Sequence, residues 1–321
     1  MKSIGVLTSG GDAPGMNAAI RSIVRVGLQR GLRVVGVQHG YSGLIGGDFM
    51  ELRAFSVSNI IQRGGTILKT DRSHEFRTPE GRKRAAEQMR RIGLDALVLI
   101  GGNGTFRGGH LFSTEQNIPV IGVPSTIDND LFGTDWTVGY DTAVNTAIYN
   151  IDKIRDTADA LERTFYIEVM GRATGFIALD VGLASGAEYI SIPEKETELD
   201  VLLELFNRQR VTKRSNIIIV AEGENEGGAL DLAQRVKAAN GMDYRVTILG
   251  HIQRGGSPTA RDRILASKLG AFAVDSLLKG ETRMMAGETN GRLTTVSLEE
   301  SFTKQKPIDE ALIELSHLLA M

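Results

Sequence analysis

Two short runs of this chain carry residues that could do chemistry. Residues 8–17 and 126–130 each follow an apolar stretch typical of a β-strand. In the first run, Gly10, Gly11 and Gly15 leave backbone N–H groups uncovered, and the helix expected to follow directs its positive end at the same turn, which favours an anion. Glycines that only shape a tight strand-to-helix turn would give the same composition.

The second run, Asp128-Asn129-Asp130, places two carboxylates two residues apart on a loop after a strand. One carboxylate could take a proton from an attacking hydroxyl while the other holds magnesium through water. An Asx-turn or a helix cap would use the same residues. Together with the glycine-rich turn, the two carboxylates indicate phosphoryl transfer. The residues alone do not decide between this catalytic role and the turn or cap.

Three further glycine loops, Gly64–Thr66, Gly101–Thr105 and Gly250–Gly256, follow strands or turns. The second comes directly after the expected strand at 96–100, at the edge where open α/β sheets bind ligands. It lacks the Rossmann fingerprint because Arg107 stands where the third glycine would fall, and no Gly-Lys-Ser/Thr of a Walker A loop occurs. A nucleotide site here would belong to another class.

Basic side chains accompany these loops, and the planar fork of arginine suits phosphate oxygens. Any one of these basic side chains, taken alone, is more typical of a solvated surface. As a set beside glycine turns, they favour a reaction centre that holds two phosphorylated ligands. We expect His251 to donate a hydrogen bond to phosphate. The basic set is Arg72, Arg77, Arg82, Arg163, Arg172, Arg245, His251 and Arg254.

The elements that position these residues alternate between β-branched runs and helical patterns. Strands are expected at 4–8, 34–38, 96–100, 120–123, 164–169, 216–221 and 246–249, and helices at 18–29 and around 144–154. This alternation predicts an α/β fold with mostly parallel sheets covered by helices on both faces. The domain boundary is expected near residues 139–141.

The composition narrows the class of protein. The 321 residues are 41% hydrophobic and 24% charged with a net charge of −2, enough for about two domains and without the basic excess of a nucleic-acid-binding protein. No run approaches the ~18 apolar residues of a membrane span. Met1–Leu7 reads directly into a strand, so we expect no signal sequence and a cytoplasmic location. The chain has no cysteine, which excludes disulfides and thiolate metal sites.

Six motifs, in order and over nearly the whole chain, resemble those of bacterial ATP-dependent 6-phosphofructokinases: residues 7–17, 62–66, 101–105, 124–130, 170–172 and 249–258. The resemblance implies the phosphofructokinase fold, with two three-layer α/β domains and mostly parallel sheets. It implies a nucleotide-binding domain at 1–139 plus 252–305, a sugar-phosphate-binding domain at 140–251 and a C-terminal helix at 306–321. It also implies a homotetramer that uses ATP and Mg²⁺ to convert fructose 6-phosphate to fructose 1,6-bisphosphate.

The resemblance also implies roles for individual residues. Asp128 is the general base for the sugar 1-hydroxyl, Arg172 and Thr126 stabilise the transferring phosphoryl group, and Gly11 lies beside them. Mg²⁺ is associated with Asn103 and Asp130. The sugar-phosphate positions are Thr126, Ile127, Asp128, Met170, Gly171, Arg172, Glu222, His251 and Arg254, with Arg163 and Arg245 reaching in from a neighbouring subunit. The nucleotide positions are Gly11, Tyr41, Arg72, Ser73, Gly102, Asn103, Gly104, Thr105 and Gly108.

Two positions bear on the phosphoryl donor. Pyrophosphate-using relatives carry aspartate at the position of Gly104 and lysine at that of Ser125, and such an aspartate would repel the α-phosphate of a nucleotide. Gly104 leaves that space open and favours ATP, while Ser125 is neither this lysine nor the glycine usual in ATP-using relatives. The chain departs from the family at Asn103, where the magnesium-associated aspartate is replaced by an amide.

A regulatory site for ADP or phosphoenolpyruvate is also implied. Arg21 and Arg25 lie one turn apart on the first helix, where an anion would relieve their repulsion, although solvation alone would accommodate them. The matching positions are Arg21, Arg25, Arg155, Glu188, Lys213 and Arg214. Ala54, Asn59 and Val211 replace charged residues of the family, so we expect a weakened effector site.

Two functions therefore remain. The first is a working ATP-dependent phosphofructokinase with Asp128 as base. The second is a paralogue that binds the same ligands but catalyses poorly and serves as a regulatory or structural subunit. Asn103 favours the second, and the other residues of the reaction centre favour the first.

Overall fold

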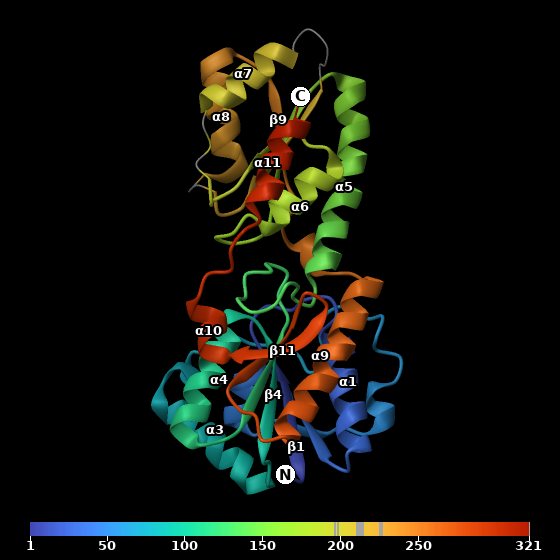
Figure 1. The fold of residues 1–321 in the computed structure, drawn as a ribbon, viewed down its shortest axis with the longest axis vertical. Coiled ribbons are helices and arrows are strands. Elements are labelled where there is room, and N and C mark those ends of the chain that lie inside the picture. The colour runs from blue at the N-terminus through green and yellow to red at the C-terminus, as the bar shows by residue number, and fades with distance from the viewer. Residues whose placement is uncertain (196, 198, 210–214, 225–226, 321) are drawn as a thin grey trace. The chain divides into compact units, whose positions relative to one another are not determined.

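The computed structural model describes residues 1–195, 197, 199–209, 215–224 and 227–320. Two compact units emerge from its contacts (Figure 1). The first unit comprises Met1–Ile127, Leu131–Thr142 and Arg254–Lys306. The second unit comprises Asp128–Asp130, Ala143–Gln253 and Pro307–Met321.

A seven-stranded sheet in the order β11-β10-β5-β4-β1-β2-β3 forms the centre of the first unit. Its interior strands are parallel, and antiparallel pairing occurs only where β3 and β11 join the two edges. All six residues of β1 and of β4 are buried because helices cover both faces. The strands are β1 (Ser3–Thr8), β2 (Arg33–Val37), β3 (Phe49–Glu51), β4 (Ala96–Gly101), β5 (Val120–Pro124), β10 (Met284–Thr289) and β11 (Arg292–Ser297).

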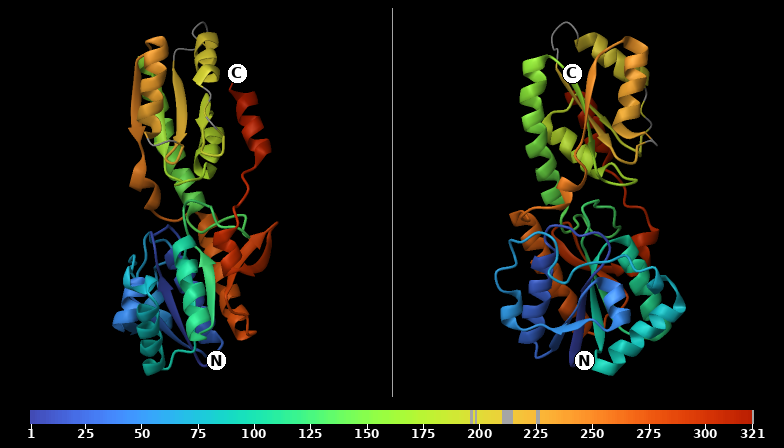
Figure 2. Two further views of the ribbon diagram at one scale, coloured as in Figure 1. Left: turned by 90° about the vertical axis from the view of Figure 1, so that its left-hand side faces the viewer. Right: turned by 180° about the vertical axis from the view of Figure 1, so that it is seen from behind.

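Helices α1 and α9 lie side by side against this sheet, with α3, α4 and α10 on its other side (Figures 1 and 2). The core between the sheet and α4 includes Leu97, Leu99, Phe106 and Met285. The helices are α1 (Met16–Gln29), α2 (Gly40–Gly46), α3 (Pro79–Ile92), α4 (Asn103–Gln116), α9 (Ala260–Leu278) and α10 (Leu298–Thr303), with short 3₁₀ turns η1 (Ala54–Val57) and η2 (Glu75–Arg77).

The second unit contains a four-stranded parallel sheet in the order β7-β8-β6-β9. Helices α7 and α8 cover one face over a core that includes Tyr166, Phe206, Ile218 and Leu232. The strands are β6 (Thr164–Val169), β7 (Tyr189–Ser191), β8 (Asn216–Ala221) and β9 (Tyr244–Ile248). The helices are α5 (Tyr140–Leu161), α6 (Phe176–Ser185), α7 (Leu199–Gln209), α8 (Gly228–Asn240) and α11 (Glu310–Leu319), with the 3₁₀ turn η3 (Gly250–Arg254).

A buried carboxylate holds the backbone at the start of α5. Asp262, in the first turn of α9, accepts hydrogen bonds from Gly139 N and Thr142 N at 2.8 Å and from Thr142 Oγ1 at 2.5 Å. Burial raises the pKa of Asp262 to about 6. The carboxylate thus supplies acceptors for helix N–H groups that have no carbonyl partner in their own helix.

The predicted α/β class with mostly parallel sheets is confirmed. The helix expected at 18–29 begins two residues earlier, at Met16, after Gly15 in a left-handed conformation. The strands β3, β7, β10 and β11 were not anticipated, and α11 contacts α6 and β7 of the second unit. No helix among the described residues is both long and apolar enough to span a membrane.

Candidate active site

The glycine-rich turn after β1 is fixed against the end of β4. Ser9 N donates to Ile100 O at 3.1 Å, and Thr105 Oγ1 donates to Ser9 O at 2.9 Å. Gly10 has φ 85° and Gly15 φ 107°, backbone conformations that strain residues with a side chain. The two predicted phosphate loops therefore meet at the carboxyl edge of one sheet, where parallel α/β sheets bind ligands.

A guanidinium group lies on this turn. A side chain on Gly11 would place its Cβ 2.8 Å from Arg254 Cζ, so glycine leaves room for the guanidinium in this position. Arg254 Nη2 donates to Asp12 O at 2.8 Å, and its Nε lies 3.7 Å from Asp12 Oδ1. A mostly buried cation thus lies against the glycine-rich turn, where it attracts an anion.

The loop after β4 leads directly into α4. Ser125 N donates to Gly101 O at 2.9 Å, and a Cβ on Gly102 would lie 3.4 Å from Thr126 Cβ. Thr126 therefore borders the first turn of α4. Gly104 faces open space, with no atom of the described chain within 4 Å of its missing Cβ.

Tyr41 supports this loop from behind. Its hydroxyl donates to Thr105 O at 2.6 Å, its ring stacks on Phe76 at 3.8 Å between centroids, and a Cβ on Gly108 would lie 3.1 Å from the ring. Burial raises the pKa of Tyr41, which keeps the phenol neutral. The hydroxyl of Tyr41, a predicted nucleotide position, is therefore hydrogen-bonded to the protein backbone.

The other nucleotide positions lie on an irregular stretch before η2. Arg72 is exposed, and Ser73 Oγ accepts a hydrogen bond from Phe76 N at 3.3 Å. The neighbouring Thr70 Oγ1 donates to Gly10 O at 2.7 Å, which fastens this stretch to the first glycine turn.

In the second unit, a buried carboxylate meets an arginine. Arg172 Nε lies 3.2 Å from Asp128 Oδ2, and the side chains are 51% and 2% exposed. Arg172 has φ 54° and Gly171 φ 145°, unusual conformations that cost free energy and cluster at functional sites. Gly223 packs directly on the Arg172 carbonyl, with its missing Cβ 2.7 Å from that carbonyl carbon. Asp128, a potential general base, therefore lies beside the positive charge of Arg172.

Neighbouring strand ends supply the remaining sugar-phosphate positions of this unit. Met170 N donates to Gln253 Oε1 at 2.9 Å, and Glu222 N donates to Val169 O at 2.9 Å. His251 is exposed on η3. Gln253, fully buried, was not anticipated as a site residue, because a lone glutamine in a glycine loop has no distinguishing sequence signal.

Arg163 and Arg245 do not join this cluster. Arg163 precedes β6, and Arg245 pairs in register with Phe165 at the amino end of that strand. Met170–Arg172 follow the carboxyl end of β6. The length of the strand, at a rise of about 3.3 Å per residue, therefore separates them from the two arginines. Within the second unit, the two arginines are therefore separated from Asp128 and Arg172. Ile127, another predicted sugar-phosphate position, is fully buried.

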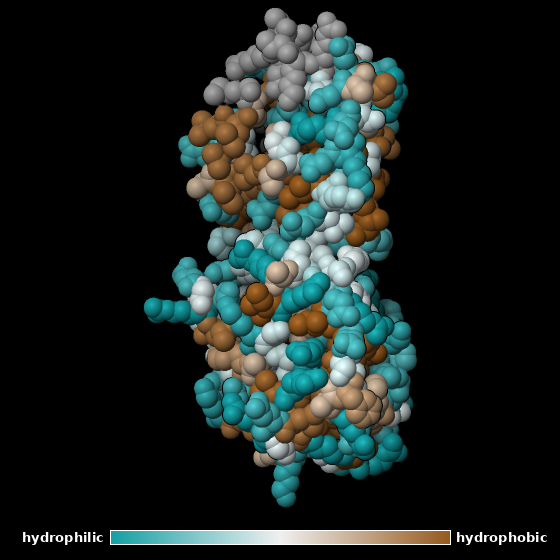
Figure 3. All heavy atoms as spheres, turned by 90° about the vertical axis from the view of Figure 1, so that its right-hand side faces the viewer, coloured by the Kyte–Doolittle hydropathy of each residue, from teal (hydrophilic) through white to brown (hydrophobic). Residues whose placement is uncertain are grey.

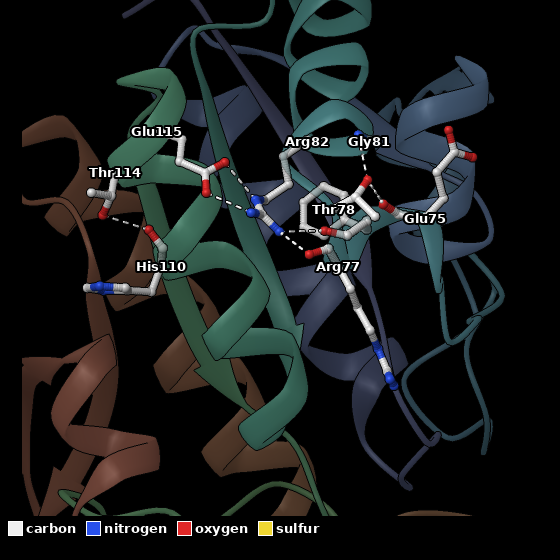
Figure 4. A network of polar contacts seen from close by, with 9 residues as sticks. Glu75, Arg77, Thr78, Gly81, Arg82, His110, Thr114 and Glu115 are labelled. Carbon is white, nitrogen blue, oxygen red and sulfur yellow. Dashed lines mark hydrogen bonds and ion pairs between the residues drawn. The ribbon is translucent and has the colours of Figure 1, made fainter.

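Arg82, one of the basic set near the glycine loops, is neither solvated nor open to a ligand. Its side chain is 5% exposed, and it donates to both carboxylate oxygens of Glu115 at 2.7 Å (Figure 4). Nη1 donates to Phe76 O at 3.0 Å and Arg77 O at 2.8 Å. Arg82 thus ties α3, α4 and η2 together, a structural role that its sequence position conceals.

The predicted effector positions divide between the units. Arg21 and Arg25 lie on successive turns of α1. In the second unit, Arg155 donates to Ser185 O at 2.6 Å and lies 3.7 Å from Glu188, which is nearly fully buried and accepts from a strand N–H. Asn59 has φ 56°, which asparagine and aspartate tolerate. Val211, Lys213 and Arg214 lie outside the described residues.

Among the described residues, no group of three or more His, Cys, Asp or Glu side chains forms a metal site. Mg²⁺ is usually bound by one or two protein oxygens together with substrate phosphates, and Asn103 and Asp130 are the residues predicted to be associated with it. Asn103 begins α4, and Asp130 follows Asp128 on its loop; both supply side-chain oxygens.

Comparison with known proteins decides the family. The phosphofructokinase family model matches residues 3–277. The chain belongs to the phosphofructokinase family. A Thermus thermophilus relative called ATP-dependent 6-phosphofructokinase 1 is 54% identical to this phosphofructokinase over 322 residues, covering 100% of both chains. A Cytophaga hutchinsonii ATP-dependent 6-phosphofructokinase is 54% identical, covering 99% of this chain and 98% of its own.

Solved structures agree on the fold. The phosphofructokinase of Saccharomyces cerevisiae superposes with a TM-score of 0.91 at 37% identity, covering 100% of this phosphofructokinase and 48% of the yeast chain. The Pichia pastoris enzyme in its T-state gives a TM-score of 0.88 at 34% identity, covering 99% of this phosphofructokinase and 36% of that chain. The predicted phosphofructokinase fold is therefore confirmed.

Proposed function

We propose that this phosphofructokinase transfers the γ-phosphoryl group of ATP to the 1-hydroxyl of fructose 6-phosphate in glycolysis, in the cytoplasm. The observation that carries the proposal is the Asp128 carboxylate, 2% exposed and 3.2 Å from Arg172 Nε. Full-length relatives at 54% identity bear the name ATP-dependent 6-phosphofructokinase, which supports both substrates.

In the proposed reaction, Asp128 accepts the proton of the sugar hydroxyl as its oxygen attacks the γ-phosphorus. The bond to the bridging oxygen of ADP breaks, and ADP leaves. Arg172, Thr126 and the N–H of Gly11 offset the negative charge on the transferring group, which is the main contribution a protein makes to this chemistry. Asn103 and Asp130 would hold Mg²⁺, which would supply positive charge to the phosphates there.

The remaining assignments follow the two units. The nucleotide positions lie in the first unit and most sugar-phosphate positions in the second. Arg163 and Arg245, separated from Asp128 within their own unit, would serve the active site of a neighbouring subunit in a homotetramer. Apolar residues reach the surface on the face shown in Figure 3. Leu161, Ile248 and Ile264 are each more than half exposed. Such residues are available to bury in subunit contacts.

The effector site is proposed to bind ADP or phosphoenolpyruvate more weakly than in typical family members. Arg21 and Arg25 are present on α1, whereas Ala54 and Asn59 supply no charge. Without those charges, an anionic ligand would have fewer favourable contacts at this site.

The proposal is tested by replacing Asp128 with asparagine, which keeps the volume and removes the base. We expect kcat to fall by about 10²–10⁴-fold in a coupled assay of fructose 1,6-bisphosphate formation, with a smaller change in sugar binding. Asp152→Asn, an exposed position on α5, is the matched control and should keep full activity. Near-normal turnover of the Asp128 variant would refute the assignment.

Asn103 supports the second candidate function, a weak catalyst, since an amide replaces a carboxylate near the metal. Restoring the charge with Asn103→Asp should raise kcat by about tenfold or more, equal to ~1.4 kcal/mol of the barrier. If that variant is no faster at any magnesium concentration, the weak-catalyst hypothesis loses its support.

A further inference from the structure

The hydrogen bonds along β6 change partner where the strand ends. Leu249 N, directly after β9, donates to Glu168 O at 3.0 Å and continues the parallel ladder. Beyond this point β9 gives way to η3. Met170 N, the first donor after β6, pairs with a side chain and donates to Gln253 Oε1 at 2.9 Å. Because Gln253 lies on η3, its oxygen takes the place of a strand carbonyl at the end of the sheet.

The Gln253 side chain is fully buried, and only one end of its amide is paired. Oε1 accepts the hydrogen bond from Met170 N, whereas Nε2 has no hydrogen-bond partner among the described residues. Burying an unpaired donor costs free energy, which an apolar side chain of similar size would avoid. What the amide contributes at this position is therefore its bond to Met170.

The loop that follows Met170 is closed on itself. Thr174 N and Thr174 Oγ1 both donate to Gly171 O, at 3.2 and 2.9 Å. Gly171 has φ 145° and Arg172 φ 54°, and such conformations persist only when surrounding contacts fix them. Arg172 Nε lies 3.2 Å from Asp128 Oδ2. The bond at Met170 N thus anchors the start of a strained loop whose arginine reaches Asp128.

We propose that Gln253 is a positioning residue that ties η3 to the loop of Met170 and Arg172, so that the sugar-phosphate positions on the two segments keep a fixed spacing. His251 lies on the same turn as Gln253. Loss of the bond lets the loop shift and moves the Arg172 guanidinium relative to Asp128. A shift of about 1 Å can cost about 10²-fold in rate. The effect on catalysis rests on the function proposed above, whereas the hold on the loop does not.

Amide hydrogen exchange of the full-length protein tests the contact without an activity assay. Met170 N–H should exchange about tenfold or more faster in Gln253→Met, equal to ~1.4 kcal/mol for one lost hydrogen bond. Gln253→Glu keeps an accepting oxygen in either protonation state and should retain the protection. Gln234→Met makes the same change at an exposed position of α8 and is the matched control. Unchanged exchange in Gln253→Met, or the same acceleration in Gln253→Glu, would overturn the proposal.

Steady-state kinetics and calorimetric titration with fructose 6-phosphate test the consequence. In Gln253→Met we expect kcat to fall by about 10²-fold and the affinity for the sugar phosphate to decrease. Gln253→Glu should recover most of both, and Gln234→Met should behave like the unmodified protein. Thermal unfolding is recorded in parallel. A lower Tm in Gln253→Met with unchanged kcat and sugar affinity would show a merely structural role and refute the positioning role.

Two further measurements keep the proposal separate from folding and from the proposed function. If Gln253→Met does not fold, Gln253→Asn replaces it, because its side chain is shorter by one methylene and withdraws the oxygen from Met170 N. The same changes in exchange and in kcat are then expected, and their absence would contradict the proposal. If the unmodified protein makes no product, the proposed function fails, while exchange at Met170 still decides whether Gln253 holds the loop.

Discussion

Gly223 sets the position of Arg172, and replacing it with alanine should disable the proposed reaction. The added Cβ would overlap the Arg172 carbonyl oxygen and lie 2.7 Å from its carbonyl carbon and 2.9 Å from Ala173 Cα. Carbon atoms in contact lie about 3.5 Å apart or more, so the carbonyl carbon alone requires the backbone to separate by at least about 0.8 Å, and the oxygen requires more. A displacement of roughly 1 Å at a catalytic group can cost about 10²-fold in rate. We therefore expect kcat to fall by about 10²-fold.

The assay measures steady-state kcat and KM for both substrates, with thermal unfolding recorded in parallel. Gly46→Ala is the matched control, because no described atom lies within 4 Å of the Cβ it would add. If Gly223→Ala keeps kcat within about twofold of the control, the backbone around Arg172 is not what positions it for catalysis. A loss of activity that merely follows a loss of folded protein would refute the reasoning equally.

Three further predictions follow. Arg82→Leu leaves Glu115 without its partner and should lower the free energy of unfolding by about 3 kcal/mol, measured by urea titration; an unchanged midpoint would contradict the structural role of Arg82. Because burial raises the pKa of Asp262 to about 6 from an ordinary 3.8, its protonation stabilises the folded state below about pH 4, and up to about 3 kcal/mol is lost as pH rises through 6. Asp262→Asn should abolish that slope in unfolding experiments across the same pH range. Gly104→Asp should raise KM for ATP by about tenfold or more, because the new carboxylate repels the phosphates. An unchanged KM would contradict the argument that Gly104 favours ATP as the phosphoryl donor.

Periodicity predicted seven of the strands and two of the helices, but it missed the interior strand β10 and the other helices. The strand expected at 164–169 coincides with β6, and the first helix differs by two residues at its start. The edge strands β3 and β11 escaped notice because partly exposed edges lack a continuous apolar run. Both pair with the strand beside them in sequence, β3 with β2 and β11 with β10, and the Asn290-Gly291 turn between β10 and β11 is a local hairpin signal that could have revealed this pair.

The sequence predicted the parts of the candidate site that consist of glycine and carboxylate motifs. It did not predict the parts that depend on tertiary contacts. Nothing local distinguishes Arg82, which is buried against Glu115, from Arg254, which lies on Gly11. Gln253 and Gly223 act through contacts with Met170 and Arg172 that are distant in the chain. Residue type therefore indicated the chemistry, while the partner of each side chain required the fold.

The place of β10 in its sheet has a consequence for synthesis on the ribosome. β10 pairs in parallel with β5, although the whole segment that forms most of the second unit is translated between them. At about 5–20 residues per second, β5 remains an exposed sheet edge for many seconds after it emerges. Unpaired edges invite association with other chains. The nascent protein therefore passes through an interval in which its first sheet is incomplete, and an early stop codon anywhere before β10 would make that vulnerable state permanent.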